Sequence, residues 1–308
     1  MINVKDLTKT YGGRKALDRV TFEVPRGEIF GFVGPNGAGK TTTIRILAAL
    51  LEPTEGQALI DGADVTRQPD LVHERLGYMP DFFGVYDQLT VSEYLHFYAA
   101  CYRQPRQRRQ KIVDDLLELV GLPERRNEAV DTLSRGLKQR LCLARALVHD
   151  PAVLLLDEPA SGLDPRARVE MREILKTLQG MGKTIVISSH ILPELTELCT
   201  MVGIIDHGKI RATGPVHEVI RRLTSGRRLR INVLGQREEA ATILASLPAV
   251  RGVETIDGAL EAQFDGDEAA AAAILQAMIA AGLKVSGFAQ MDSDLEDAFL
   301  KATSEQVG

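Results

Sequence analysis

The sequence predicts an α/β protein with a mainly parallel sheet, followed by a small α+β domain. Apolar segments of strand length alternate with helical segments, as in parallel sheets whose strands are joined by helices. These apolar segments are residues 28–33, 152–156 and 184–188. The first of them ends in a glycine-rich loop that leads directly into a helix. With 308 residues, the chain is long enough for about two domains of ~150 residues each.

The other elements of the first domain follow from the same kind of pattern. Residues 1–7 and 17–24 alternate like strands, and a turn at 11–13 joins them. Helical spacing of apolar residues predicts further helices at residues 43–51, 93–101, 112–120, 137–148, 166–179 and 192–199. Ser92 is the expected N-cap of the second of these helices, and residues 202–210 are expected to form a hairpin.

After residue 226 the pattern changes to shorter elements. Strand, helix, strand, strand, helix and strand are predicted at residues 230–234, 236–247, 250–256, 259–264, 267–281 and 284–289, with a last helix at 295–302. This order is that of a split βαβ, ferredoxin-like unit. Residues 227–308 carry 7 Lys and Arg against 13 Asp and Glu, so this module is acidic. We therefore expect one domain over residues 1–222, with a helical subdomain at 85–150, and a second domain over residues 227–308.

Composition and charge argue against several classes of protein. Hydrophobic residues make up 44% and charged residues 26%, as in ordinary globular proteins. The net charge of −5 disfavours a nucleic-acid coat and a polybasic membrane binder, and no nucleic-acid partner is expected. No apolar run reaches the ~18–20 residues of a membrane-spanning helix, and the first residues lack the pattern of a secretory signal. The three cysteines lie far apart, which favours reduced thiols.

A phosphate-binding loop follows the first buried strand. Its spacing is Gly, four residues, Gly, Lys, Thr, and it comprises Gly34, Pro35, Asn36, Gly37, Ala38, Gly39, Lys40, Thr41 and Thr42. Backbone amides of such a loop and the start of the next helix point at phosphates, where the helix dipole favours negative charge. Lys40 is expected to reach the terminal phosphates of a nucleotide, and Thr41 to place its hydroxyl on Mg²⁺.

Two carboxylates stand at the end of a second buried strand. Asp157 and Glu158 follow residues 153–156, at the strand end where parallel sheets bind ligands. Asp157 is placed to hold Mg²⁺, and Glu158 to orient or deprotonate an attacking water. Paired acids at a strand end are often only solvated, but the phosphate-binding loop in the same chain favours a catalytic role.

Further motifs in a fixed order make the chain resemble a nucleotide-binding subunit of an ABC transporter. Tyr11 resembles the aromatic residue that stacks on adenine, and residues 133–137 resemble the family signature. Residues 161–164, ending in Asp164, resemble the loop that crosses the dimer interface. His190 resembles the switch histidine that contacts the γ-phosphate. The resemblance covers residues 1–220, and the tail resembles the small extension of some exporter ATPases.

The resemblance implies a P-loop ATPase fold, ATP and Mg²⁺ as ligands, and a dimer that sandwiches two ATP molecules. The signature residues Ser134, Arg135 and Gly136 would then act on the ATP bound by the other protomer. Glu158, His190 and Asp164 would form the catalytic set. The dimer would be a homodimer or a heterodimer with a similar ATPase. It would bind a transmembrane permease, which would hold it at the cytoplasmic face of the membrane. ATP hydrolysis would power transport through that permease, with export favoured as the direction.

Three positions depart from the usual family pattern. Asp81 stands where the family usually has Gln; it is shorter and charged, and we expect it to reach the metal ion through water. Arg135 replaces one residue of the signature glycine pair, and Leu137 replaces Gln. A basic residue at position 135 is similar to a subset of exporter ATPases, so these departures are interpreted as marks of a subfamily.

Two other functions and one surface feature stay open at this point. A non-transport ABC-type ATPase acting on DNA or the ribosome is the first alternative, although the chain has one cassette and no long heptad insert. A P-loop kinase is less favoured because it explains neither residues 134–136 nor His190. The basic stretch 103–111 fits contact with lipid headgroups or an acidic partner, or simply a solvated start of a helix.

Overall fold

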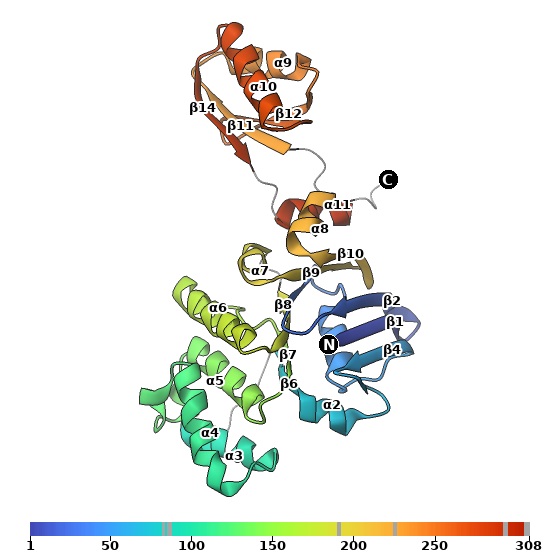
Figure 1. Ribbon diagram of the computed structural model, residues 1–308, viewed down its shortest axis with the longest axis vertical. Coiled ribbons are helices and arrows are strands. Elements are labelled where there is room, and N and C mark those ends of the chain that lie inside the picture. The colour runs from blue at the N-terminus through green and yellow to red at the C-terminus, as the bar shows by residue number, and fades with distance from the viewer. Residues whose placement is uncertain (82–83, 85–87, 190–191, 224–226, 292–294, 305–308) are drawn as a thin grey trace. The chain divides into compact units, whose positions relative to one another are not determined.

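A computed structural model describes residues 1–81, 84, 88–189, 192–223, 227–291 and 295–304 (Figure 1). The chain divides into two compact units, Met1–Val216 and His217–Gly308. This division lies ahead of the predicted boundary at residues 222–227. Each unit has its own hydrophobic core, so each is described by itself.

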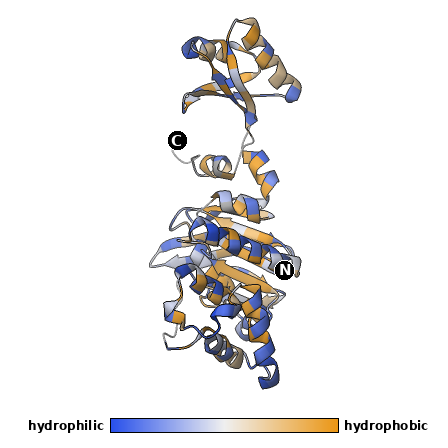
Figure 2. Cartoon of the chain, turned by 90° about the vertical axis from the view of Figure 1, so that its left-hand side faces the viewer, coloured by the Kyte–Doolittle hydropathy of each residue, from blue (hydrophilic) through white to orange (hydrophobic). Residues whose placement is uncertain are grey.

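A six-stranded sheet forms the centre of the first unit. Its order is β10-β9-β3-β8-β7-β6, and its strands are β3 (Ile29–Val33), β6 (Leu76–Met79), β7 (Val153–Asp157), β8 (Thr184–Ser189), β9 (Met201–Asp206) and β10 (Lys209–Pro215). All neighbouring pairs are parallel except β9 and β10. Every residue of β3 and β7 is buried, and Figure 2 shows the hydrophobic character of the strands inside this unit. The mainly parallel sheet predicted from the sequence is confirmed.

A second, antiparallel sheet packs on the first. Its order is β2-β1-β4-β5, with β1 (Ile2–Tyr11), β2 (Arg14–Val24), β4 (Glu55–Ile60) and β5 (Ala63–Asp64). Phe22 of β2 stacks on Phe30 of β3 with ring centroids 5.0 Å apart, which joins the two sheets in one core. Strands β1 and β2 agree with the sequence prediction, whereas β4, β5 and helix α2 (Pro69–Arg75) were not predicted.

Helices cover the parallel sheet and build a separate helical layer. They are α1 (Lys40–Leu47), α3 (Val91–Cys101), α4 (Arg106–Leu119), α5 (Arg135–Leu147), α6 (Pro165–Gly180) and α7 (Leu192–Leu198). Helices α3, α4 and α5 pack against one another and lie together at one end of the unit (Figure 1). Short 3₁₀ turns at Pro123–Arg125 and Val130–Thr132 connect α4 to α5.

Two predicted helix starts are wrong. The N-cap of α3 is Thr90, not Ser92: Thr90 and Glu93 form a reciprocal capping box, which satisfies two backbone donors at once. Helix α4 begins at Arg106 instead of residue 112, because Pro105 fixes the backbone before it. Residues 106–111 of the basic stretch therefore form the first half of α4, which agrees with their interpretation as the solvated start of a helix, whereas residues 103–105 precede it.

The second unit has the predicted ferredoxin-like arrangement. Helix α8 (Val216–Leu223) leads into β11 (Arg227–Val233), α9 (Arg237–Ser246), β12 (Val250–Ile256), β13 (Ala259–Phe264), α10 (Glu268–Ala280), β14 (Val285–Met291) and α11 (Leu295–Ser304). The antiparallel sheet has the order β12-β13-β11-β14, with the two strands that follow the helices at its edges. Apolar residues of β11 and β13 pack against α9 and α10. No helix in the described parts of the chain is long and apolar enough to cross a membrane.

Candidate functional site

The phosphate-binding loop leaves β3 and enters α1 through two glycines that have no room for a side chain. A Cβ at Gly34 would lie 2.3 Å from the carbonyl oxygen of Ile205, and one at Gly39 would lie 2.6 Å from Cδ2 of Leu17. Gly39 is also the N-cap of α1, with a φ of 114° that other residues rarely adopt. The loop is thus fixed against the hairpin of β9 and β10 and against β2, and its shape is set before any ligand binds.

Lys40 is buried, with only 7% of its surface exposed. Its Nζ donates hydrogen bonds to the carbonyl oxygens of Gly34 at 2.7 Å and Pro35 at 3.3 Å. Burial lowers the pKa of Lys40, while the nearby carboxylates of Glu158 and Asp157 act in the opposite direction. The ammonium group therefore lies inside the loop, at the position where an anion gains most from it.

Asp157 and Thr41 bring two hard oxygen donors together. Thr41 Oγ1 lies 3.4 Å from Asp157 Oδ1, and Asp157 is 1% exposed. The same Oδ1 accepts a hydrogen bond of 2.6 Å from Ser188 Oγ, which fixes the carboxylate. No cluster of three or more potential metal ligands occurs among the described residues. One carboxylate and one hydroxyl fit Mg²⁺, which typically takes few protein ligands and completes its shell with phosphates and water.

Glu158 has a strained backbone held by the neighbouring strand. Its φ is +54°, the left-handed region that non-glycine residues rarely adopt and that is concentrated at functional sites. Its amide donates to Ser188 Oγ at 2.9 Å and to the Ser188 carbonyl oxygen at 3.2 Å. Ser188 thereby fixes the side chain of Asp157 and the backbone of Glu158 together. Ser188 was not predicted from the sequence; the available signal was a polar residue near the end of a buried strand.

The signature segment forms the N-terminal end of α5. Ser134 is its N-cap and accepts a hydrogen bond of 3.4 Å from the Leu137 amide. The guanidinium of Arg135 lies over Gly162, so close that a Cβ at Gly162 would meet its Cζ at 2.5 Å. Gly136 packs beside Leu163: a Cβ at Gly136 would lie 3.4 Å from Leu163 Cδ2, which is an ordinary van der Waals contact.

A second link between α5 and this loop escaped the sequence analysis. Gln139 is 2% exposed, and its Nε2 donates to the carbonyl oxygen of Ser161 at 3.1 Å. The Ser161 amide in turn donates to the Glu158 carbonyl oxygen at 3.1 Å. Gln139 lies one helical turn after Arg135 on the same face, so one face of α5 holds the loop that follows Glu158.

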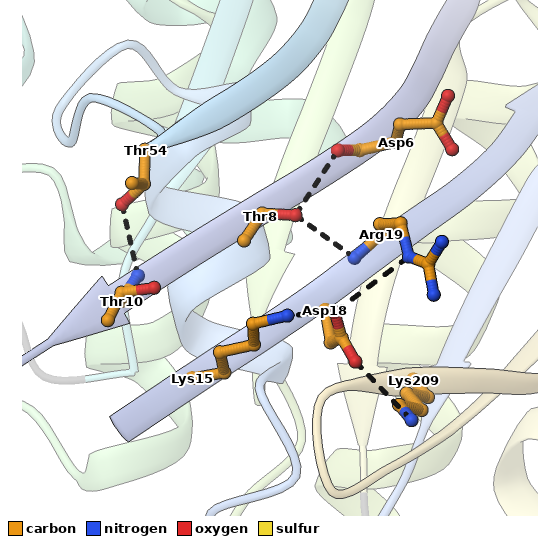
Figure 3. Close-up of polar contacts among 8 residues, drawn as sticks. All are labelled: Asp6, Thr8, Thr10, Lys15, Asp18, Arg19, Thr54 and Lys209. Carbon is orange, nitrogen blue, oxygen red and sulfur yellow. Dashed lines mark hydrogen bonds and ion pairs between the residues drawn. The ribbon is translucent and has the colours of Figure 1, made fainter. Parts of the chain in front are cut away.

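Tyr11 ends β1 with its ring 49% exposed, and the Lys9 ammonium lies 5.3 Å from the ring centroid. Figure 3 shows the contacts that fix this edge of the site. Asp18 pairs with Lys15 at 2.7 Å and Lys209 at 3.3 Å, which connects β2 to the hairpin of β9 and β10. The hydrogen bond from Lys15 is the main reason that the pKa of Asp18 is lowered.

Thr8 and Thr10 fix the same strand from the other side. The Arg19 amide donates to Thr8 Oγ1 at 3.1 Å, and the Thr10 amide donates to Thr54 Oγ1 at 3.0 Å (Figure 3). These bonds hold β1 between β2 and the segment that leads into β4. Tyr11 is therefore carried on a strand that is fixed along both of its edges.

The remaining predicted residues are distributed as follows. Asp164 is the N-cap of α6 and accepts a hydrogen bond of 2.9 Å from the Ala167 amide. Asp81 is exposed just beyond β6, and the described residues give it no hydrogen bond to Thr41 or Asp157. His190 lies outside the described residues.

A groove of about 390 Å³ separates the helical layer from the sheets. Its lining comes from α2, β6, the end of α3, α5 and the segment after α1, and it includes Leu50, His73, Tyr78, Tyr98, Tyr102 and Arg145. Leu50 is 58% exposed and Tyr102 is 37% exposed. An apolar groove with exposed aromatic walls is typical of a protein-binding surface.

Comparisons with known proteins match both units. Residues 17–161 match the family described as "ABC transporter", and residues 214–303 match "ATP-binding protein DrrA1-3-like, C-terminal domain". The chain is 34% identical over 304 residues to the daunorubicin/doxorubicin resistance ATP-binding protein DrrA of Streptomyces peucetius, covering 98% of this chain and 92% of that protein.

A longer relative and a solved structure each match about 70% of the chain. The chain is 40% identical over 214 residues to the probable multidrug ABC transporter ATP-binding protein YbhF of Escherichia coli. That match covers 70% of this chain but 37% of YbhF, so the chain spans about a third of that relative. A dimeric post-hydrolysis structure of the ATP-binding cassette MJ0796 with ADP and Pi superposes with a TM-score of 0.64 at 26% identity, over 70% of this chain and 98% of that one.

Proposed function

Because the chain belongs to the family of ABC transporter ATP-binding subunits, we propose that it hydrolyses ATP to power export through a separate transmembrane permease. The observation that carries this proposal is the convergence of Lys40, Thr41 and Asp157 beside Glu158. A loop preformed for phosphates and a strained catalytic carboxylate together fit hydrolysis better than binding alone. The names of DrrA and YbhF, with "resistance" and "multidrug", support export as the direction.

In the proposed reaction, the chain's own residues bind ATP, orient the attacking water and accept its proton. Amides of the loop and the Lys40 ammonium hold the phosphates of ATP. Mg²⁺, held by Thr41 and Asp157, would neutralise charge that develops on the phosphates. Glu158 accepts a proton from the attacking water, and Ser188 keeps Glu158 and Asp157 in fixed relation. Tyr11 stacks on adenine, and His190 contacts the γ-phosphate.

We infer that two cassettes act together. Ser134 and the amides at the start of α5 present hydrogen-bond donors and a helix dipole to an anion, which would be the γ-phosphate on the other protomer. The dimer of the MJ0796 cassette supports this arrangement. Asp164 fixes the start of α6 at the proposed interface, and Asp81 would reach the metal through water.

The groove lined by Tyr78, Tyr98 and Tyr102 is the proposed docking site for the permease. It lies between the sheet that carries the phosphate-binding loop and the helix that carries the signature, so an occupant contacts both. This position explains how hydrolysis would move the partner. With the permease bound there, the protein would be a peripheral subunit at the cytoplasmic face of the membrane.

The test is to capture the Glu158→Gln variant with ATP from detergent-solubilised membranes and identify its partners by mass spectrometry. The proposal expects one multi-span membrane protein in stoichiometric amount. A matched variant, Tyr98→Ala with Glu158→Gln, removes one wall of the groove and should lose that protein while it still binds ATP. Recovery of the Glu158→Gln form only with ribosomes, with DNA or alone would contradict a role in transport.

A further inference from the structure

A strongly basic segment spans the short connection after α3 and the first half of α4. Residues 103–111 contain no acidic side chain and five basic ones: Arg103, Arg106, Arg108, Arg109 and Lys111. Arg103, Arg106 and Arg108 are exposed. No ion pair involving these three is found among the described residues. The chain as a whole is acidic, with a net charge of −5, so this segment is a local exception.

The helix itself does not explain these charges. The N-terminus of a helix carries partial positive charge, so acidic residues stabilise it and basic residues oppose it. The first turn of α4 has no acidic residue, and neither Arg106 nor Arg108 has an acid four residues later to pair with. The next acidic residues along α4 form ion pairs with other side chains: Asp114 pairs with Arg126, and Asp115 pairs with Lys111. A local rule broken in this way, without a compensating contact, points to a binding surface.

The basic segment is continuous with the groove. Tyr102, the C-cap of α3, lines the groove and stacks on His149 with ring centroids 3.8 Å apart; Arg103 follows it directly. Phe97, on the same helix, is 43% exposed. Tyr102 thus belongs to the wall of the groove, whereas the exposed arginines that follow it are free to meet phosphates, as basic segments do at an anionic membrane surface.

We propose that Arg103, Arg106 and Arg108 bind anionic phospholipid headgroups of the leaflet that surrounds the permease. The proposal rests on the proposed function in one respect: a permease in the groove brings α4 close to the membrane. Guanidinium groups bind phosphates in a bidentate manner. Cytoplasmic loops of membrane proteins carry an excess of Lys and Arg and would repel this segment, so charge complementarity favours the lipid over the permease.

The test uses the full chain with vesicles of phosphatidylglycerol and, separately, of phosphatidylcholine, in a flotation assay. The wild-type protein is expected to bind only the phosphatidylglycerol vesicles, and this binding should weaken as the salt concentration is raised. Each arginine contributes about a fivefold gain in binding. The R103Q/R106Q/R108Q variant should therefore bind on the order of 100-fold more weakly. The matched control K5Q/R67Q/K284Q removes three exposed basic side chains elsewhere and should bind like the wild type.

Two outcomes overturn the proposal. If the wild type fails to bind phosphatidylglycerol, or if the two triple variants bind it equally, these arginines are not a lipid site. If R103Q/R106Q/R108Q binds vesicles normally but no longer co-purifies with the membrane protein captured by Glu158→Gln, the segment contacts that protein instead. Arginine-dependent vesicle binding without any co-purified permease would leave the lipid site standing and count against the transport role.

Discussion

The side-chain amide of Gln139 donates a hydrogen bond of 3.1 Å to the carbonyl oxygen of Ser161, and the Ser161 amide donates to the Glu158 carbonyl oxygen at 3.1 Å. These two bonds connect the signature helix to the proposed general base of the same chain. Arg135 lies over Gly162 in the same loop. We therefore expect a displacement of α5, such as contact with a second protomer would cause, to reach the backbone of Glu158 through these bonds.

Replacement of Gln139 by Leu tests this connection. Leu has a similar size and lacks the donor, so the loop loses one hydrogen bond worth ~1 kcal/mol while the core stays filled. We expect ATP affinity to stay unchanged and kcat to fall by a factor of up to about 10², as for a catalytic group misplaced by about 1 Å. The Leu143→Ala variant, at a buried position of the same helix outside the signature segment, is the control for general loosening of α5. Unchanged turnover in Gln139→Leu, measured by phosphate release, would show that the bond has no role in catalysis.

Ser188 is expected to be as important as the carboxylates that it holds. In Ser188→Ala, the buried Asp157 loses a charge-assisted hydrogen bond, which costs ~1.5–3 kcal/mol of stability, and Glu158 loses one of its two backbone contacts. Thermal unfolding should report the loss of stability, and Mg²⁺-dependent ATPase activity should fall. Ser188→Thr keeps the hydroxyl and should restore activity in large part. Equal activity of the Ala and Thr variants would exclude a positioning role for the hydroxyl.

Gly34 is predicted to tolerate no side chain. The Cβ of Gly34→Ala would collide with the backbone of Ile205, so the loop has to shift, and nucleotide binding measured by fluorescence of a labelled ATP analogue should be lost. Gly180→Ala is the control, since no atom lies within 4 Å of its Cβ position and Ala favours a helix by up to ~1 kcal/mol. Retained nucleotide binding in Gly34→Ala would mean that the loop is less constrained than its contacts indicate.

The lowered pKa of Lys40 predicts proton uptake when ATP binds under alkaline conditions. Burial lowers the pKa in the free protein, and phosphate charge raises it again in the complex. Between these two pKa values the bound state holds more protons, so ATP affinity falls as pH rises. Calorimetry at alkaline pH in two buffers of different ionisation enthalpy measures this uptake directly. Lys40→Arg, which stays charged, should show none, and identical heats for the wild type in both buffers would contradict the prediction.

The sequence predicted the parts of the fold that depend on local pattern and failed where the structure depends on distant contacts. The buried strands β3, β7 and β8 are apolar runs, and the helices between them indicate that they are parallel, whereas their order in the sheet, β3-β8-β7, was not predicted. Strand β4 was not anticipated because Glu55–Ile60 is half exposed and lacks clear alternation. In the site, the motif residues were found because their spacing is local. Ser188 and Gln139 were missed because their partners are 31 and 22 residues away.

The most direct test of the central claim is to compare ATP binding and ATP turnover in Glu158→Gln. The amide keeps the size of the carboxylate but cannot accept the proton of the attacking water. We expect ATP affinity within about twofold of the wild type, and turnover reduced by a factor of about 10² or more, as for loss of a general base. Wild-type turnover in this variant would contradict the assignment of Glu158 and, with it, the proposed mechanism of hydrolysis.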